Sequence, residues 1–177
     1  KSAKYFDLHL VKRTSDKAHL SALGASNFHV WSHGVYSPLF HPPDAFADSY
    51  RYPVSFVGTC MDDRVDLVEY LLMNHIDLHV FGTHWNKRSS LPKRYPGNFH
   101  RPVRGKAYAD VVRQSQVCLG LVSKSNKDEW TMRTYEVPGC SSVLLAERTP
   151  KHEKLFNEGE EAEFFSDKEE CLHKLKV

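Results

Sequence analysis

The stretch VSFVGTCMDDRVDLVEYLLMNHIDLHVFG, residues 54–82, decides the class of fold. It opens with a short apolar run, continues as an amphipathic segment with an acidic first turn, and closes with a second apolar run that ends at Gly82. Short apolar runs are typical of buried strands, and apolar residues three or four positions apart are typical of a helix that packs on a sheet. The order strand, helix, strand predicts a βαβ unit, and therefore parallel strands joined by a right-handed crossover.

The alternation of strands and helices continues towards the carboxyl end of the chain. The sequence predicts helices at residues 106–116, 128–139 and 166–176, a short helix around 152–156, and strands at 117–124, 142–147 and 162–165. Residues 83–105 are polar and basic, and they predict a long loop. We therefore expect residues 44–177 to form an α/β domain with a doubly wound parallel sheet.

A shorter set of elements precedes this domain. Residues 5–13 and 27–34 predict strands, and residues 14–24 between them predict a helix that closes on Gly24. Residues 36–53 carry four prolines and little periodicity, which indicates a linker. We expect residues 1–43 to be a separate part of the chain.

Composition limits the partners and the compartment. Lys and Arg number 24 against 22 for Asp and Glu, which leaves a net charge of +2 and no global basic field for nucleic acid or an anionic membrane. No apolar run approaches the roughly 20 residues that span a bilayer, and the first residues do not resemble a signal peptide. The wide spacing of the four cysteines favours reduced thiols, so we expect a cytoplasmic protein.

Several common kinds of site have no support in the sequence. There is no G-x-G-x-x-G or P-loop motif, no G-x-S-x-G elbow, and no Cys/His cluster or H-E-x-x-H helix for a metal. Cys140 has no histidine partner nearby in sequence and predicts a small buried residue. Residues 87–104 hold six Lys/Arg and two aromatics, but a cluster confined to one loop favours a solvated or acceptor-facing loop over nucleic-acid binding.

In an open parallel sheet, the ligand-binding site is expected in the loops where strands end and helices begin. Gly58 and Gly82 follow two predicted strands and allow the backbone to approach a ligand closely. Arg64 follows in the first turn of a helix, where a cation opposes the helix dipole and a bound phosphate would give it a reason. The alternative is an ion pair from Arg64 to Asp62 or Asp63.

The segment DEWTMRTYE, residues 128–136, offers a second set of charges. Asp128 and Glu129 fall at the predicted start of a helix, where carboxylates cap free N–H groups. Arg133 and Glu136 are three residues apart and share a helix face, which predicts either an internal ion pair or a site. A carboxylate in this place can accept the two hydroxyls of a ribose.

Four segments in order carry a resemblance to a known family. FHVWSHGVYSPLFHP (28–42) resembles a hinge segment, through Ser32, His33, Gly34, Val35, Tyr36, Phe40 and Pro42. Residues 54–85, 108–147 and 152–175 resemble the opening, the most diagnostic block and the tail of a sugar-nucleotide domain. The chain resembles the carboxyl-terminal half of a GT-B-fold glycosyltransferase. It is most similar to the CgeB-like group (spore maturation protein B) and more distantly similar to the retaining group-1 glycosyltransferases.

This resemblance implies roles for individual residues. In the Glu, seven residues, Glu signature of the retaining enzymes, Glu136 takes the place of the acid that binds the donor ribose. Asp128 stands where the first acid contacts the transferred hexose, and Glu129 beside it could substitute. Arg64 lies six residues after Gly58, the offset of a diphosphate-binding Lys, while Thr59 replaces a cation common in relatives.

Other matches extend the implied donor site. Arg133 matches the CgeB-like pattern and would contact the diphosphate, together with the loop from Ser123 to Lys127. Trp85 matches the same pattern and would pack under the base. The resemblance implies a UDP- or GDP-sugar as donor, an unknown acceptor, retention of configuration and no required metal.

Residues 1–43 would then be a remnant of an amino-terminal domain plus the hinge. We expect a fragment that binds a sugar nucleotide but does not transfer glycosyl groups efficiently alone, and a homodimer through the remnant stays open. Another GT-B relative, such as a nucleotide-sugar epimerase or a phosphorylase, is one alternative. A non-catalytic α/β binding module is the other, and it would have no nucleotide affinity.

Overall fold

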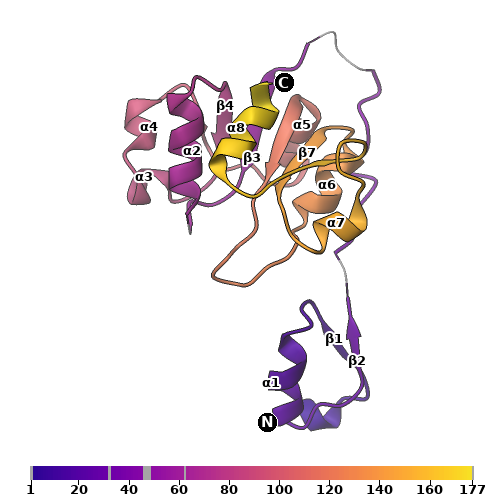
Figure 1. The fold of residues 1–177 in the computed structure, drawn as a ribbon. Coiled ribbons are helices and arrows are strands. Elements are labelled where there is room, and N and C mark those ends of the chain that lie inside the picture. Colours follow the sequence, from indigo (N-terminus) through magenta and orange to yellow (C-terminus); the bar gives the residue numbers. More distant parts are fainter. Residues whose placement is uncertain (1, 32, 46–48, 62, 177) are drawn as a thin grey trace. The chain divides into compact units, whose positions relative to one another are not determined.

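The structure is a computed structural model that describes residues 2–31, 33–45, 49–61 and 63–176. Two residues considered above, Ser32 of the hinge segment and Asp62, lie outside the described residues. Contacts between Cα atoms divide the chain into two compact units, residues 1–34 and residues 35–177 (Figure 1). Each unit is described by itself.

The first unit is one strand, helix, strand motif. After a short 3₁₀ turn (Ala3–Tyr5) it contains β1 (His9–Val11), α1 (Asp16–Ala22) and β2 (Phe28–Val30). The two strands are parallel, with His9 opposite Phe28. The three predicted elements are confirmed. Phe6, Leu8, Leu10 and Trp31 are each more than half exposed, so much of the apolar surface of residues 2–31 is not packed.

The second unit contains a six-stranded sheet in which every neighbouring pair is parallel. Its strands are β3 (Tyr52–Val57), β4 (Leu78–Phe81), β5 (Phe99–His100), β6 (Ser115–Gly120), β7 (Val143–Glu147) and β8 (Glu163–Phe165). Their order is β5-β4-β3-β6-β7-β8, so the direction of winding reverses between β3 and β6. The predicted doubly wound sheet is confirmed, and the β3–β6 crevice is where such sheets bind ligands.

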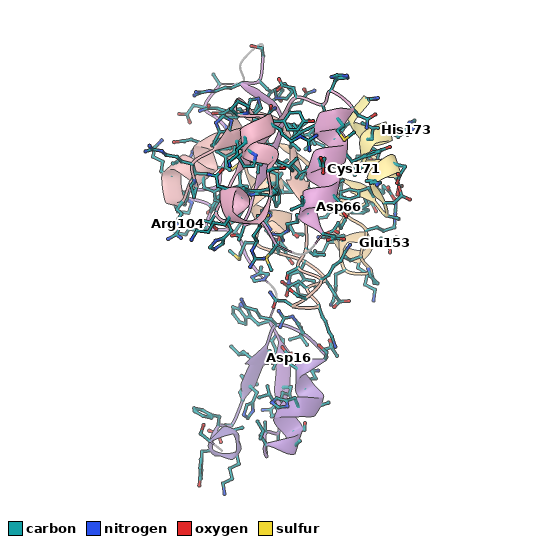
Figure 2. All side chains as sticks on the ribbon, turned by 90° about the vertical axis from the view of Figure 1, so that its left-hand side faces the viewer. Asp16, Asp66, Arg104, Glu153, Cys171 and His173 are labelled. Carbon is teal, nitrogen blue, oxygen red and sulfur yellow. The ribbon has the colours of Figure 1, made fainter. Side chains whose placement is uncertain are left out.

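Helices cover both faces of this sheet (Figure 1). The strands show why, because Leu144 and Ala146 of β7 pack in one core cluster and Leu145 packs in another. One face carries α2 (Arg64–Met73) and α8 (Lys168–Lys176), which contact each other; Figure 2 labels Asp66 on α2 and Cys171 on α8. The other face carries α5 (Gly105–Arg113) and α6 (Arg133–Gly139). A short helix, α7 (His152–Leu155), lies between β7 and β8 in the chain.

The basic segment after β4 is more ordered than predicted. Instead of a loop, residues 83–105 contain two one-turn helices, α3 (Trp85–Arg88) and α4 (Leu91–Arg94), and the edge strand β5. Trp85 and Leu91 are 3% and 1% exposed and belong to the same core cluster as α2. Each buried side chain anchors one turn, which is why the segment folds despite its charge.

The helix predicted from residue 128 begins later, at Arg133, with Met132 as its N-cap. Asp128 and Glu129 therefore lie in the loop before the helix and do not cap it. The side chain of Trp130 between them and the helix is buried, and the Thr131 N–H donates to the Thr134 hydroxyl at 3.1 Å. Burial of Trp130 takes the chain away from a helical path until residue 133. In the described part of the chain, no helix is long and apolar enough to cross a membrane.

Candidate functional site

The carboxyl ends of β3 and β6 meet two arginines. Arg64, the first residue of α2, is 5% exposed. Its Nη1 donates to the Thr59 carbonyl at 2.9 Å, and its Nη2 donates to the carbonyls of Leu121 and Val122 at 3.3 and 3.2 Å. The predicted position of Arg64 in the first turn is confirmed, and its guanidinium joins the loops that follow β3 and β6.

Arg133 approaches the same place from α6. Its Nη1 donates to the Val57 carbonyl at 2.9 Å and its Nη2 to the Leu121 carbonyl at 3.1 Å. The guanidinium carbons of Arg64 and Arg133 lie 5.4 and 5.7 Å from the centre of the Phe56 ring. Two cations therefore converge on the crevice between β3 and β6.

The alternative of an ion pair between Arg133 and Glu136 is wrong, because no described carboxylate lies within ion-pair distance of the Arg133 guanidinium. Its Nε is buried and has no hydrogen-bond partner among the described residues. Carbonyl dipoles compensate part of the cost of holding a guanidinium away from water, and an anion would compensate more. The crevice thus suits a negatively charged ligand.

Glu136 lies one helical turn beyond Arg133 and is 7% exposed. The Tyr108 hydroxyl of α5 donates to Glu136 Oε2 at 2.8 Å. Burial raises the pKa of the Glu136 carboxyl above its usual value, while the Tyr108 hydrogen bond and the nearby Arg133 charge act in the opposite direction. Glu136 is therefore a buried hydrogen-bond acceptor next to the crevice.

Gly58 and Gly82 bring two loops into contact. The Gly58 N–H donates to the Phe81 carbonyl at 2.9 Å, and the Trp85 Nε1–H donates to the Gly58 carbonyl at 3.0 Å. A Cβ atom at position 82 would collide with the Gly58 carbonyl. The close approach that needs Gly82 is therefore one between the loops after β3 and β4.

Trp85 packs in the core, with its ring 6.3 Å from that of Phe56 and 5.5 Å from that of Phe99. Only 3% of its surface is exposed, so Trp85 serves mainly as a core residue. A cavity of about 550 Å³ opens beside it and is lined by residues that include Thr83, His84, Lys87, Pro96 and Arg101. Cavities of this size accommodate small organic ligands.

The loop between β6 and α6 carries the other predicted residues. Ser123 is buried, its hydroxyl lies 3.1 Å from that of Ser125, and its carbonyl accepts the Asp128 N–H at 3.0 Å. Lys127 is exposed and has a φ of 54°, in the left-handed region. Asp128 is half-buried and Glu129 is exposed, and the Glu129 carbonyl accepts the Thr149 hydroxyl at 2.7 Å.

Two residues near the crevice were missed in the sequence. Glu147, at the end of β7, accepts the Val122 N–H at 2.7 Å and lies 3.7 Å from Lys124, which also pairs with Asp63. Burial raises the pKa of the Glu147 carboxyl. Its place as the last residue of a predicted strand was the available signal. Tyr108, in contrast, precedes Glu136 by 28 residues and gave none.

Metal and thiol chemistry find no further support. In residues 2–31, 33–45, 49–61 and 63–176, no group of three or more His, Cys, Asp or Glu side chains could hold a metal ion. All four cysteines are free and buried, which agrees with the expected reduced thiols. Cys140 is 1% exposed and burial raises the pKa of its thiol, so the prediction of a small buried residue is confirmed.

Solved structures of glycosyltransferases share this fold. HepE of Anabaena, crystallised in complex with UDP-glucose, matches with a TM-score of 0.70 and 8% identity over 99% of this chain and 54% of its own. TarM matches with a TM-score of 0.65 and 9% identity, over 99% of this chain and 37% of its own. The C-terminal domain of LpcC, a group 1 family glycosyl transferase of Francisella tularensis, matches with a TM-score of 0.60 and 11% identity, over 81% of this chain and 86% of its own.

These likenesses show the fold, a Rossmann-like α/β domain of the GT-B glycosyltransferases. The chain spans about a third of the length of TarM and about half of the length of HepE. A search of curated proteins finds none that matches the chain significantly. The sequence profile of the family described as "Glycosyl transferase-like" matches residues 64–177, from the crevice arginine of α2 to the end of the chain, and the protein therefore belongs to the glycosyl transferase-like family.

Proposed function

We propose that residues 44–177 bind a nucleotide-diphosphate sugar, with UDP or GDP as the nucleotide, and act as the donor domain for glycosyl transfer to an acceptor. The observation that carries the proposal is the convergence of Arg64 and Arg133 on the β3–β6 crevice, one helical turn from the buried Glu136. Two cations and a carboxylate in one crevice suit the diphosphate and the ribose hydroxyls of a nucleoside diphosphate.

The arginines would act on the leaving group. Cleavage of a glycosyl-phosphate bond leaves negative charge on the nucleoside diphosphate, and fixed cations stabilise that charge without reorganising during the reaction. The carbonyls of Val57, Thr59 and Leu121 hold both guanidinium groups in place before any ligand binds. A resident metal ion is not required for this role.

The other parts of the donor can be assigned to residues around the two arginines. Glu136 would accept the ribose hydroxyls, and the Ser123–Lys127 loop would close over the diphosphate. Asp128 and Glu129, which follow Lys127 in the chain, would face the transferred sugar. We assign the base to the cavity beside Thr83 and His84 rather than to the ring of Trp85, because that ring is buried in the core.

UDP is the first nucleotide to test, since HepE was crystallised with UDP-glucose and with UDP and glucose. Within the glycosyltransferases we place the chain in the CgeB-like group, on the segments quoted above. Residues 1–43 would be the remnant of an amino-terminal domain with its hinge. We also propose a cytoplasmic location, on the wide spacing of the four cysteines.

The exposed apolar side chains of residues 2–31 are the basis for a proposed self-association. We propose that a second copy covers Leu8, Leu10 and Trp31 at high protein concentration. Light scattering over a concentration series would show a dimer, and Leu10→Lys would return it to a monomer. A monomer at every concentration would contradict this.

Calorimetric titration with UDP, GDP, UDP-glucose and GDP-mannose tests the proposed function. We expect micromolar binding of one nucleotide and its sugar, lost in Glu136→Ala and in Arg64→Ala. Glu160→Ala, an exposed carboxylate between α7 and β8, is the control and should bind as the unaltered protein does. No affinity for any of the four, with the protein folded, would favour a binding module without a nucleotide site.

A further inference from the structure

The Glu136 carboxylate has one hydrogen-bond donor in the described part of the chain, and that donor comes from another helix. Tyr108 lies near the start of α5, and its hydroxyl donates to Oε2 at 2.8 Å. The second carboxylate oxygen, Oε1, makes no hydrogen bond with the described residues and is not among the fully buried polar atoms. One oxygen is thus held by the protein, and the other is left to a ligand.

The Tyr108 ring is itself fixed in place. It is half-buried and packs edge-on against Phe40, with ring centres 5.5 Å apart and planes at 65°. Phe40 belongs to the core cluster that includes Val137 of α6, the residue next to Glu136. The hydroxyl therefore reaches Glu136 from a rigid support rather than from a mobile surface side chain.

A buried carboxylate needs such a donor. A Glu side chain has several rotamers, and only some of them would direct Oε1 towards a bound ribose. A hydrogen bond to a charged group stabilises both the orientation and the ionised state of that group. Because the two hydroxyls of a ribose are donors, the carboxylate must be ionised to accept both.

We propose that Tyr108 is a positioning residue of the donor site: its hydroxyl holds Oε2 of Glu136 so that Oε1 is presented to the ribose hydroxyls of a nucleoside diphosphate. This inference rests on the proposed function for the identity of the ligand. The contact between Tyr108 and Glu136 exists without a ligand, so it can also be tested without one.

The electrostatics of the site agree with this geometry. Burial raises the pKa of Glu136, and the Tyr108 hydroxyl and Arg133 are the two groups that oppose the rise. Cys118 of β6 and Cys140 after α6 also lie near the pair, and burial keeps both thiols protonated by raising their pKa values. Removal of the Tyr108 hydroxyl should therefore raise the Glu136 pKa further.

The test uses Tyr108→Phe, which keeps the ring against Phe40 and removes only the hydroxyl. Tyr135→Phe is the matched control, because Tyr135 is adjacent to Glu136 in α6 and its hydroxyl makes no hydrogen bond with the described residues. Each protein is titrated calorimetrically with UDP and with 2′,3′-dideoxy-UDP, which lacks both ribose hydroxyls.

We expect Tyr108→Phe to weaken UDP binding about 10-fold, the size of one hydrogen bond to a charged group. Its affinity for 2′,3′-dideoxy-UDP should stay within about twofold, and Tyr135→Phe should bind both as the unaltered protein does. Equal weakening for both nucleotides would show general damage to the fold and overturn the inference. So would unchanged UDP binding.

A second measurement separates this inference from the proposed function. Carbon-13 NMR titration of the Glu136 carboxyl, assigned through Glu136→Gln, should show a higher pKa in Tyr108→Phe than in the unaltered protein or Tyr135→Phe. An unchanged pKa overturns the positioning role even if UDP binds. Failure of both UDP and GDP to bind the unaltered protein overturns the ribose assignment, together with the proposed function, even if the pKa rises.

Discussion

Arg64 and Arg133 donate to one and the same carbonyl oxygen, that of Leu121, at 3.3 and 3.1 Å from opposite sides of the crevice. Each also binds the backbone at the end of β3, Arg64 through Thr59 and Arg133 through Val57. The two side chains therefore have a structural task, since they tie β3 to β6, and a proposed chemical one, since they bring two positive charges to the place where winding reverses.

These two tasks can be separated at Arg133. Arg133→Lys keeps the positive charge but cannot donate to Val57 and Leu121 in the geometry of a guanidinium. We expect Arg133→Ala to weaken UDP binding by at least about 10-fold and Arg133→Lys to recover part of this loss, as measured by calorimetry. Arg94→Ala, which removes an exposed cation paired with Glu69, is the control and should leave binding unchanged. Unaltered UDP affinity in folded Arg133→Ala would contradict the role of the arginine in the site.

The contact between the loops of Gly58 and Gly82 predicts a stability effect. Gly82→Ala places a methyl group against the Gly58 carbonyl, and the backbone must shift to accommodate it. We expect the free energy of unfolding to fall by about 1–3 kcal/mol, as measured by urea denaturation. At Gly97 an added Cβ meets nothing within 4 Å, so Gly97→Ala should change this free energy by less than about 0.5 kcal/mol. Similar effects of the two substitutions would count against the described loop contact.

The burial of Glu136 predicts how UDP binding depends on pH. The folded-state pKa of this acid is raised above the usual 4.5, so it takes up its proton at a higher pH than an exposed glutamate does. The protonated form accepts ribose hydroxyls less well, and affinity should therefore fall as pH is lowered through the raised pKa. Glu136→Gln should bind weakly with a flatter profile. A profile for the unaltered protein as flat as that of Glu136→Gln would contradict the ribose role.

The sequence predicted the regular part of the fold and missed its irregular parts for physical reasons. The βαβ unit of residues 54–82 was clear because its strands and helix are long enough to show the apolar periodicity of each element. The one-turn helices α3 and α4 were missed because four residues are too few to show a period. Asp128 and Glu129 suggested a helix start because acidic residues often cap helices. They are also common in loops, and the sequence did not show that Trp130 after them is buried and that the helix begins later.

Some features of the candidate site could be predicted from the sequence, and others could not. The positions of Arg64 and Glu136 on the helices that follow β3 and β6 could be predicted from the pattern of elements, and their roles in a donor site stay predictions. The hydrogen bond from Tyr108 to Glu136 could not, because it joins two helices whose packing depends on the whole core between β6 and α6. Trp85 was expected to face a base, and its burial shows that an aromatic at a loop start can serve the core instead.

The most direct test of the account is a titration of the nitrogen-15-labelled protein with UDP, followed through the backbone amide signals. The account predicts saturable shifts at the crevice, with Gly58, Thr59, Val122 and Glu136 among the residues that move most. Little change is expected at Glu160, in the exposed segment between α7 and β8. Shifts confined to residues away from β3 and β6, or no shifts at millimolar UDP or at millimolar GDP with the protein folded, would contradict the proposed nucleotide site.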